Sequence, residues 1–212
     1  NRGEAEIPCQ WRRQDGFTFP NQKFDLRASN SYTSLVKPSL FNQTPEELSA
    51  VLNDLGEPSY RGEQILDWLW RKRTSSIDGM SNLPARLRDQ LKASFSLQSL
   101  THARAQGSAD STRKFLFRLH DGRYVETVLI PASPALYGER SDRRTLCVSS
   151  QVGCAFGCKF CASGLDGFTR NLSADEIAGQ VILAEELSSE QFNYFVFRGM
   201  GEPMANMSPL LR

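Results

Sequence analysis

The stretch TLCVSSQVGCAFGCKFCASG at residues 145–164 decides the fold of this 212-residue chain. It begins as a short apolar strand and continues into a glycine-rich loop. Downstream, Ser173 and Glu176 form the capping box of a helix predicted over 173–189, and residues 193–198 are apolar enough for the next strand. Strand, loop, helix and strand make the first βαβ unit of a parallel α/β domain, whose ligands bind at the carboxyl ends of the strands.

Upstream of this unit, the pattern predicts short helices and then a β-hairpin. Thr44, Pro45 and Glu47 are a helix start, and further helices are expected over 61–73 and after Asn82. These helices form a module of about 60 residues, which is too small to bury a large core alone and is better suited to binding. The polar residues 101–112 are expected to be a linker. Alternating apolar residues flank the turn Asp121-Gly122, which predicts the hairpin.

These patterns give four segments. We expect a leader or extension over 1–37, a helical module suited to binding over 38–104, a linker and β-hairpin over 105–144, and an incomplete barrel domain over 145–212. The fold class is α/β, with the first βα units of a partial parallel (β/α) barrel after the hairpin. Because the chain starts at Asn and one βαβ unit does not close a sheet, we expect it to be a fragment.

Composition narrows the class of protein. The chain is 40% hydrophobic and 23% charged with a net charge of +1, which excludes collagen-like and wholly disordered proteins. Its longest apolar runs are far shorter than the roughly 20 residues of a spanning helix, so we expect no membrane association. Residues 58–104 carry eight Lys and Arg against four Asp and Glu. Trp68 and Trp70 beside the basic residues 71–73 could bind RNA, and the same cations could instead complement the helix dipole.

Five cysteines, three of them within eight residues, argue against a secreted disulfide scaffold. Cys154, Cys158 and Cys161 offer three thiolates from one loop. A [4Fe-4S] cluster normally takes four, so three leave one iron open to chelation by S-adenosyl-L-methionine. Zinc is the main alternative, followed by unliganded core cysteines. A fourth zinc ligand would have to be found among Cys9, His102, His120 and Cys147.

The loop GMGEP at residues 199–203 follows the second predicted strand. Gly201 and Glu202 would present backbone groups and a carboxylate to an ammonium group, such as that of S-adenosyl-L-methionine. Glycine-rich turns that end in proline are also common between helices and strands without any binding role. Because GMGEP follows a three-cysteine loop by one βα unit, it favours a cofactor site.

Residues 145–177 together with VFRGMGEP resemble the radical S-adenosylmethionine enzymes that methylate carbon 2 of adenine in 23S rRNA and in certain tRNAs. The stretches GEPSYRGEQILDWLWRKR and MSNLPARLRDQL are similar to that family's N-terminal helical RNA-binding module, which implies RNA binding for residues 38–104, and KFLFRLHDGRYVETVLIP is similar to its hairpin. The likeness covers about residues 40–212 and leaves out 1–37. It implies a [4Fe-4S] cluster and S-adenosyl-L-methionine as cofactors.

By this resemblance Cys154, Cys158 and Cys161 hold the cluster, and Gly201 and Glu202 bind S-adenosyl-L-methionine. Glu126 matches the family's proton acceptor, although a polar residue on the solvent face of a hairpin is an equal interpretation. Cys147 matches a second essential cysteine, which resolves an enzyme–RNA thioether by forming a disulfide. Without the resemblance we would interpret Cys147 as a small buried hydrophobe.

The chain departs from the family in two respects. The methyl-carrying cysteine has no counterpart, because no cysteine follows Cys161, so we expect the fragment alone to be inactive. Arg198 stands where the family is commonly apolar.

Alternative functions are a related adenine-C8 rRNA methyltransferase and a non-enzymatic RNA-binding truncation product. The resemblance also implies a flavodoxin or ferredoxin as electron donor, a monomer, and location in the cytoplasm, with a plastid or other organelle as the alternative.

Overall fold

A computed structural model describes residues 37–107, 112–132, 142–165 and 167–211. The predicted leader therefore lies outside the described residues except for Lys37, as does most of the loop between the hairpin and residue 142. No helix in the described part of the chain is long and apolar enough to span a membrane.

The helical part begins where the sequence predicted it. Thr44 caps α1 through a complete capping box with Glu47, and a proline occupies the first turn. Gly56, with φ of +72°, allows the chain to turn away after the helix. The helices of this part are α1 (Pro45–Asp54), α2 (Tyr60–Leu66), its π-helical continuation (Asp67–Arg71), and α3 (Ala85–Ser94), with short 3-10 turns at Leu40–Asn42 and Ile77–Gly79.

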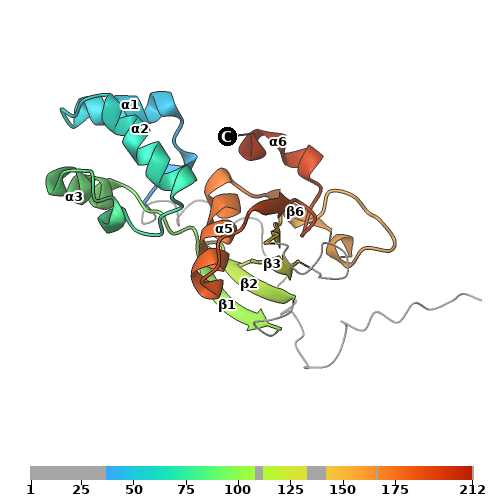
Figure 1. Ribbon diagram of the computed structural model, residues 1–212. Helices are drawn as coiled ribbons and strands as arrows, with labels where there is room; N and C mark the ends of the chain where they lie inside the picture. The colour runs from blue at the N-terminus through green and yellow to red at the C-terminus, as the bar shows by residue number, and fades with distance from the viewer. Residues whose placement is uncertain (1–36, 108–111, 133–141, 166, 212) are drawn as a thin grey trace, which may run out of the picture. The chain divides into compact units, whose positions relative to one another are not determined.

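These helices lie together (Figure 1) and share one apolar core. Helices α1 and α3 each contribute two leucines four residues apart, and Leu52, Leu87 and Leu91 are fully buried. The core continues onto Ala178 and Ile182, which belong to the long helix α5 (Ala174–Ser188). The small module therefore obtains part of its buried surface from the α/β part of the chain, as its size leads one to expect.

A mixed five-stranded sheet forms the α/β part, in the order β1-β2-β3-β4-β7. All neighbours are antiparallel except β4 and β7, which are parallel and are joined through α5. This is the predicted βαβ unit. The strands are β1 (Leu100–Gln106), β2 (Arg113–Leu119), β3 (Tyr124–Pro131), β4 (Arg144–Cys147) and β7 (Tyr194–Val196).

The linker predicted over residues 101–112 is wrong for its first half, because Leu100–Gln106 is strand β1. Only Leu100 of this strand is buried, so the alternation that normally reveals a strand is missing. The backbone ladder with β2 fixes it at the edge of the sheet, where polar side chains face solvent on both sides.

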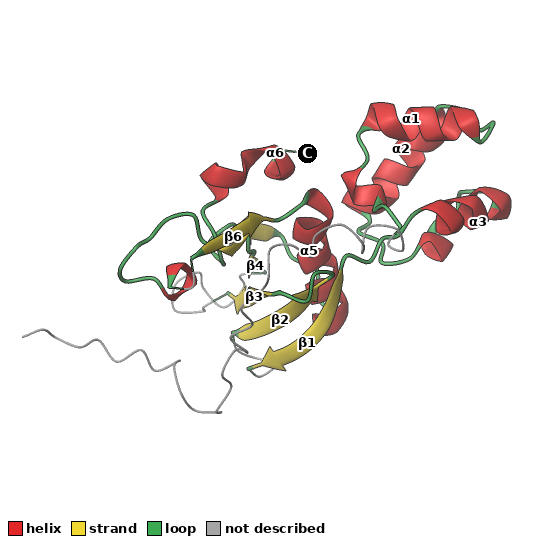
Figure 2. Ribbon diagram, turned by 180° about the vertical axis from the view of Figure 1, so that it is seen from behind, coloured by secondary structure: helices red, strands yellow, loops and turns green. Residues whose placement is uncertain are grey.

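Helix α5 covers one face of the sheet and contacts β1, β2 and β3 (Figure 2). The second apolar core lies between them, with Phe115, Phe117 and Val125 of the hairpin fully or almost fully buried. Two further strands, β5 (Gln151–Gly153) and β6 (Phe168–Asn171), pair antiparallel and enclose the cysteine loop. The described chain ends in a 3-10 turn (Pro203–Asn206) and α6 (Met207–Leu210).

Candidate functional site

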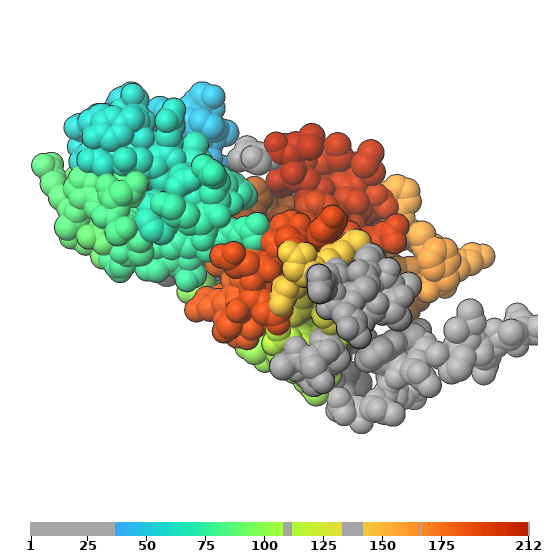
Figure 3. Space-filling model, viewed as in Figure 1, coloured from blue at the N-terminus to red at the C-terminus, as the bar shows by residue number. Residues whose placement is uncertain are grey.

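The cysteine loop projects from the base of the β5–β6 hairpin, in light orange at the right of Figure 3. Two glycines fix its base: a Cβ on Gly153 would lie 1.9 Å from the carbonyl oxygen of Gly167. Within the loop, Cys161 N–H donates to the Cys158 carbonyl at 3.1 Å. The thiols are accessible, since Cys158 is exposed and Cys154 and Cys161 are half-buried.

Three accessible thiols on one loop fit an iron–sulfur cluster held by three thiolates. The described residues nevertheless contain no group of three His, Cys, Asp or Glu side chains already gathered for one metal ion. The ligand assignment therefore stays a prediction. Of the possible fourth ligands for zinc, His102 packs against the Phe117 ring and His120 lies 3.4 Å from Glu176, while Cys9 is outside the described residues.

The GMGEP loop packs directly against the segment that leads into the cysteine loop. Ser150 and Gln151 both donate their N–H groups to the Met200 carbonyl, at 2.8 and 3.1 Å. Gly201 has φ of +99°, and a Cβ there would lie 2.5 Å from the Cβ of Gln151. The carboxylate of Glu202 accepts the Met204 N–H at 3.1 Å, which caps the following turn. Close packing therefore requires this glycine whatever the loop binds.

Gln151 links the two loops. Its side-chain Oε1 accepts N–H groups from Ala155 of the cysteine loop at 3.1 Å and from Glu202 of the GMGEP loop at 3.0 Å. Its Nε2 donates to Asn171 Oδ1 of β6 at 2.8 Å. The residue is 0% exposed. One buried amide thus fixes the predicted cluster loop and the predicted S-adenosyl-L-methionine loop relative to one another.

A second buried amide supports the same segment from α5. Gln180 Oε1 accepts from Thr127 Oγ1 and Ser149 N, and its Nε2 donates to the Ser149 carbonyl at 3.0 Å. Ser149 Oγ donates to the Glu126 carbonyl at 2.6 Å and accepts the Met200 N–H. Sequence reasoning missed this network. The sequence signal for it was the polar run SSQ at residues 149–151. This run continues a buried strand, so its polar groups need hydrogen-bond partners inside the protein.

Cys147 ends strand β4, directly opposite Val128 of β3 and Val196 of β7. It is 8% exposed. Burial raises the pKa of its thiol, because the thiolate loses water, while the backbone N–H and the charge of Arg198 oppose that rise. All four described cysteines are free. The disulfide expected during turnover stays a prediction.

Glu126 lies two residues before Val128 on β3 and therefore on the same sheet face as Cys147. Diagonal neighbours of this kind are roughly 7–8 Å apart in antiparallel sheets. Lys114 Nζ contacts Glu126 Oε1 at 2.8 Å, and 41% of the glutamate side chain is exposed. The structure thus brings both predicted catalytic residues to the face opposite α5.

Arg170 anchors β6, and with it the end of the cysteine loop. Its guanidinium forms a two-pronged ion pair with the buried Glu176, at 2.7 and 2.8 Å, and contacts Asp121 Oδ2 at 2.8 Å. These carboxylates raise the pKa of Arg170 despite burial. Burial of Asp121 opposes its ionisation, but the Arg170 hydrogen bond prevails and lowers the pKa of that carboxyl.

The basic segment after α2 is mostly engaged in internal contacts. Arg71 and Lys72 pair with Asp67, and Lys72 Nζ also lies 3.8 Å from the centre of the Trp68 ring. Arg73 pairs with Glu185 of α5. These contacts favour a structural role for the cations, whereas the 86% exposed side chain of Arg71 leaves it accessible to a phosphate.

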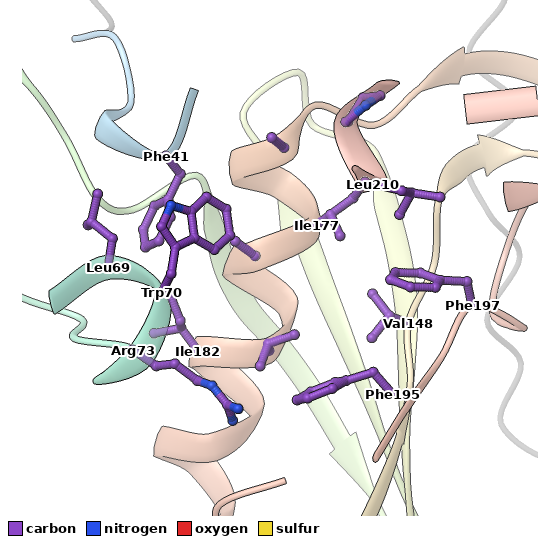
Figure 4. Close-up of a pocket in the computed structure, with 14 residues that line it drawn as sticks. Phe41, Leu69, Trp70, Arg73, Val148, Ile177, Ile182, Phe195, Phe197 and Leu210 are labelled. Atoms are coloured by element: carbon purple, nitrogen blue, oxygen red, sulfur yellow. The ribbon is translucent and has the colours of Figure 1, made fainter. Parts of the chain in front are cut away.

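A cavity of about 260 Å³ is lined in part by Trp70 and Arg73 of the basic segment, but by none of the candidate cysteines, Glu126 or the GMGEP loop (Figure 4). Its lining is almost wholly apolar and comes from the helical part, α5, β7, α6 and the residues that follow β4 and β7. Trp70 and Phe41 meet there edge to face, with ring centres 5.4 Å apart. Nothing in this lining offers acid–base or metal-binding chemistry.

Comparisons with known proteins agree with these elements. Residues 39–97 match the family model described as the ribosomal RNA large subunit methyltransferase N-terminal domain. The chain is similar to the probable dual-specificity RNA methyltransferase RlmN of Akkermansia muciniphila, with 51% identity, covering 82% of this chain and 48% of that protein. The corresponding protein of Bacillus cereus strain B4264 is 40% identical, covering 88% of this chain and 50% of its own length.

Among solved structures, a radical SAM methyltransferase from Sphaerobacter thermophilus matches with a TM-score of 0.69 and 40% identity, over 82% of this chain and 50% of that one. The family resemblance drawn from the sequence is therefore confirmed, as is the α/β fold class. The sheet is mixed, with β4 and β7 as its parallel pair, and the predicted partial parallel barrel stays a prediction. The chain spans about half the length of the curated relatives it matches.

Proposed function

We propose that this chain supplies the RNA-binding module and the cofactor-binding portion of a radical S-adenosyl-L-methionine transferase that methylates carbon 2 of adenine in 23S rRNA and tRNA. The observation that carries the proposal is the common location of two loops and two side chains. The cysteine loop and the GMGEP loop are linked by Gln151, and Cys147 and Glu126 share the sheet face opposite α5.

Each residue has a role that its surroundings support. Cys154, Cys158 and Cys161 would hold the [4Fe-4S] cluster, which when bound supplies the electron that cleaves S-adenosyl-L-methionine. Glu202, beside the glycines, binds the amino group of that cofactor through its carboxylate. Glu126, partly exposed and paired with Lys114, accepts the proton from adenine C2.

Cys147 completes the reaction as a nucleophile. Its thiolate attacks the sulfur of a thioether that joins a second cysteine to the methylene group on adenine C2. An S–S bond forms, the S–C bond breaks, and the carbon takes the electron pair and a proton to become the methyl group. The family resemblance assigns the second thiol to a cysteine that has no counterpart in these 212 residues. A flavodoxin or ferredoxin as reductant, a monomeric state and a cytoplasmic location belong to the same proposal.

The test uses the full-length protein with its cluster and a reductant, acting on rRNA that lacks the modification. Mass mapping of the product should find the new methyl group on adenine C2, and a methyl group on C8 would overturn the position. Cys147→Ala should trap a covalent protein–RNA adduct. Normal release of methylated RNA by this variant would overturn the role of Cys147.

A further inference from the structure

Two cations of strand β2 flank Glu126. In the ladder between β2 and β3, Glu126 is paired with Leu116, and Lys114 and Arg118 lie two residues to either side of Leu116. Because side chains alternate along a strand, all four residues share one face of the sheet. The alternate residues of β2 are buried in the core beneath α5, so the shared face is the one opposite α5.

The two cations differ in what they contact. Lys114 Nζ contacts Glu126 Oε1 at 2.8 Å. Arg118 is exposed, and in the part of the chain that the structure describes no ion pair or hydrogen bond engages its guanidinium. Its Nη2 lies beside the hairpin turn, where a Cβ on Gly122 would be 3.8 Å away. Glu126 can balance one of the two positive charges, so this part of the face keeps an excess of positive charge.

The neighbouring strand β1 adds to that excess. Arg104 is paired with Leu116 across the ladder, so it lies on the same face, and it is exposed. Glu126 is the only acidic residue in the three strands β1, β2 and β3. At the hairpin turn, Asp121 is already held by Arg170 at 2.8 Å. We call Arg104, Lys114 and Arg118 the cationic patch.

The cationic patch adjoins the predicted catalytic residues. Arg118 is a diagonal neighbour of Glu126, and Glu126 is in turn a diagonal neighbour of Cys147 on the far side. With each diagonal step roughly 7–8 Å, Arg118 lies about 15 Å from Cys147 along one line of the sheet. An adenine that reaches both Glu126 and Cys147 brings the phosphates of its own strand to the surface beside them. Exposed guanidinium groups suit phosphate oxygens, to which they can donate two parallel hydrogen bonds.

We propose that Arg118, together with its diagonal neighbour Arg104, binds RNA phosphates that flank the target adenine and thereby positions this base at Glu126. The inference rests on the proposed RNA methyltransferase function, and it deepens that function by assigning an RNA-binding surface outside the helical module. Contacts with phosphates fix the register and orientation of a nucleic acid without reading its sequence. Arg118 is therefore a positioning residue.

The test measures binding of an unmodified 23S rRNA hairpin transcript to the full-length protein with its cluster, at several salt concentrations. Arg118→Met should weaken binding about two- to fivefold, the effect of one exposed ion pair. The slope of log affinity against log salt should become shallower by about 0.7–0.9, the value for one phosphate contact. Arg118→Lys should keep the wild-type slope. With dithionite as reductant, the loss in Arg118→Met should appear in KM for RNA rather than in kcat.

Arg123→Met is the matched control. It removes the same charge from the same hairpin, but the Arg123 guanidinium faces Asp121, 3.8 Å from Nε to Oδ2, so the salt slope should stay as in wild type. Arg118→Gln is a second neutral variant if Arg118→Met folds poorly. A wild-type slope and affinity in the Arg118 variants would overturn the proposal. Equal losses in Arg118→Met and Arg123→Met would do the same, because they would indicate a general effect of charge.

Two other outcomes are distinguishable. If the cationic patch bound the electron donor, Arg118→Met would raise KM for flavodoxin and leave RNA binding unchanged, which overturns the proposal. If the proposed function failed, the wild-type protein would bind the transcript without methylating adenine C2. Failure of the inference alone would leave C2 methylation intact in wild type, while Arg118→Met bound RNA as tightly as wild type.

Discussion

Replacing Gln151 with leucine should uncouple the two loops of the candidate site. The side chain is completely buried, and leucine fills a similar volume without polar atoms. The substitution removes the acceptor for the N–H groups of Ala155 and Glu202 and the donor to Asn171. Three polar groups would then be left without their partner.

The expected loss of stability follows from those three polar groups. An unsatisfied buried donor or acceptor costs about 1–3 kcal/mol, and all three bonds here are only part-buried, so the lower end applies to each. We expect Gln151→Leu to lower the free energy of unfolding by about 2–4 kcal/mol. Gln180→Leu is the matched control, since that glutamine is equally buried and forms four side-chain bonds.

Urea unfolding of the 212-residue chain measures both free energies, and hydrogen exchange locates the change. Gln180→Leu should lose at least as much stability, because its four bonds are buried, but only Gln151→Leu should speed exchange in both loops, over 154–165 and 199–205. If both variants give the same exchange in these loops, Gln151 is an ordinary core residue and the reasoning is refuted.

Two further predictions concern the supports of the site. Gly201→Ala should destabilise the chain by about 1 kcal/mol more than Gly122→Ala, because both glycines have positive φ but only the Cβ at 201 meets backbone and side-chain atoms within 3 Å; equal urea midpoints would contradict this. Asp121→Asn should lower the free energy of unfolding by about 0.5–1 kcal/mol at pH 6, because a partly exposed ion pair such as Asp121–Arg170 contributes little more than this. Since Arg170 lowers the pKa of Asp121, its contribution is complete above the ordinary value near 3.8 and disappears as pH falls through the lower folded-state pKa. A difference from wild type that stays constant between pH 6 and pH 3 would refute the assignment.

Local signals in the sequence were sufficient for most elements. Both capping boxes, at Thr44 and Ser173, form as predicted, and alternation placed β2 and β3 correctly. Strand β1 escaped notice because an edge strand with one buried residue has no apolar alternation. Its place is set by backbone pairing with β2, which is a long-range property.

The candidate site, too, was only partly predictable from local sequence. Motif spacing found the cysteines and GMGEP, but the buried amides that connect them depend on tertiary contacts. Gln151 bonds to partners 4, 20 and 51 residues away.

The most direct test of the account is the metal and sulfide content of the chain after anaerobic reconstitution. Three thiolates on one loop predict about four iron and four sulfide per chain. Alanine at any one of Cys154, Cys158 or Cys161 should abolish or greatly reduce this content, whereas Cys147→Ala should leave it unchanged. One tightly bound zinc without sulfide, or a cluster lost on removing Cys147, would contradict the central claim.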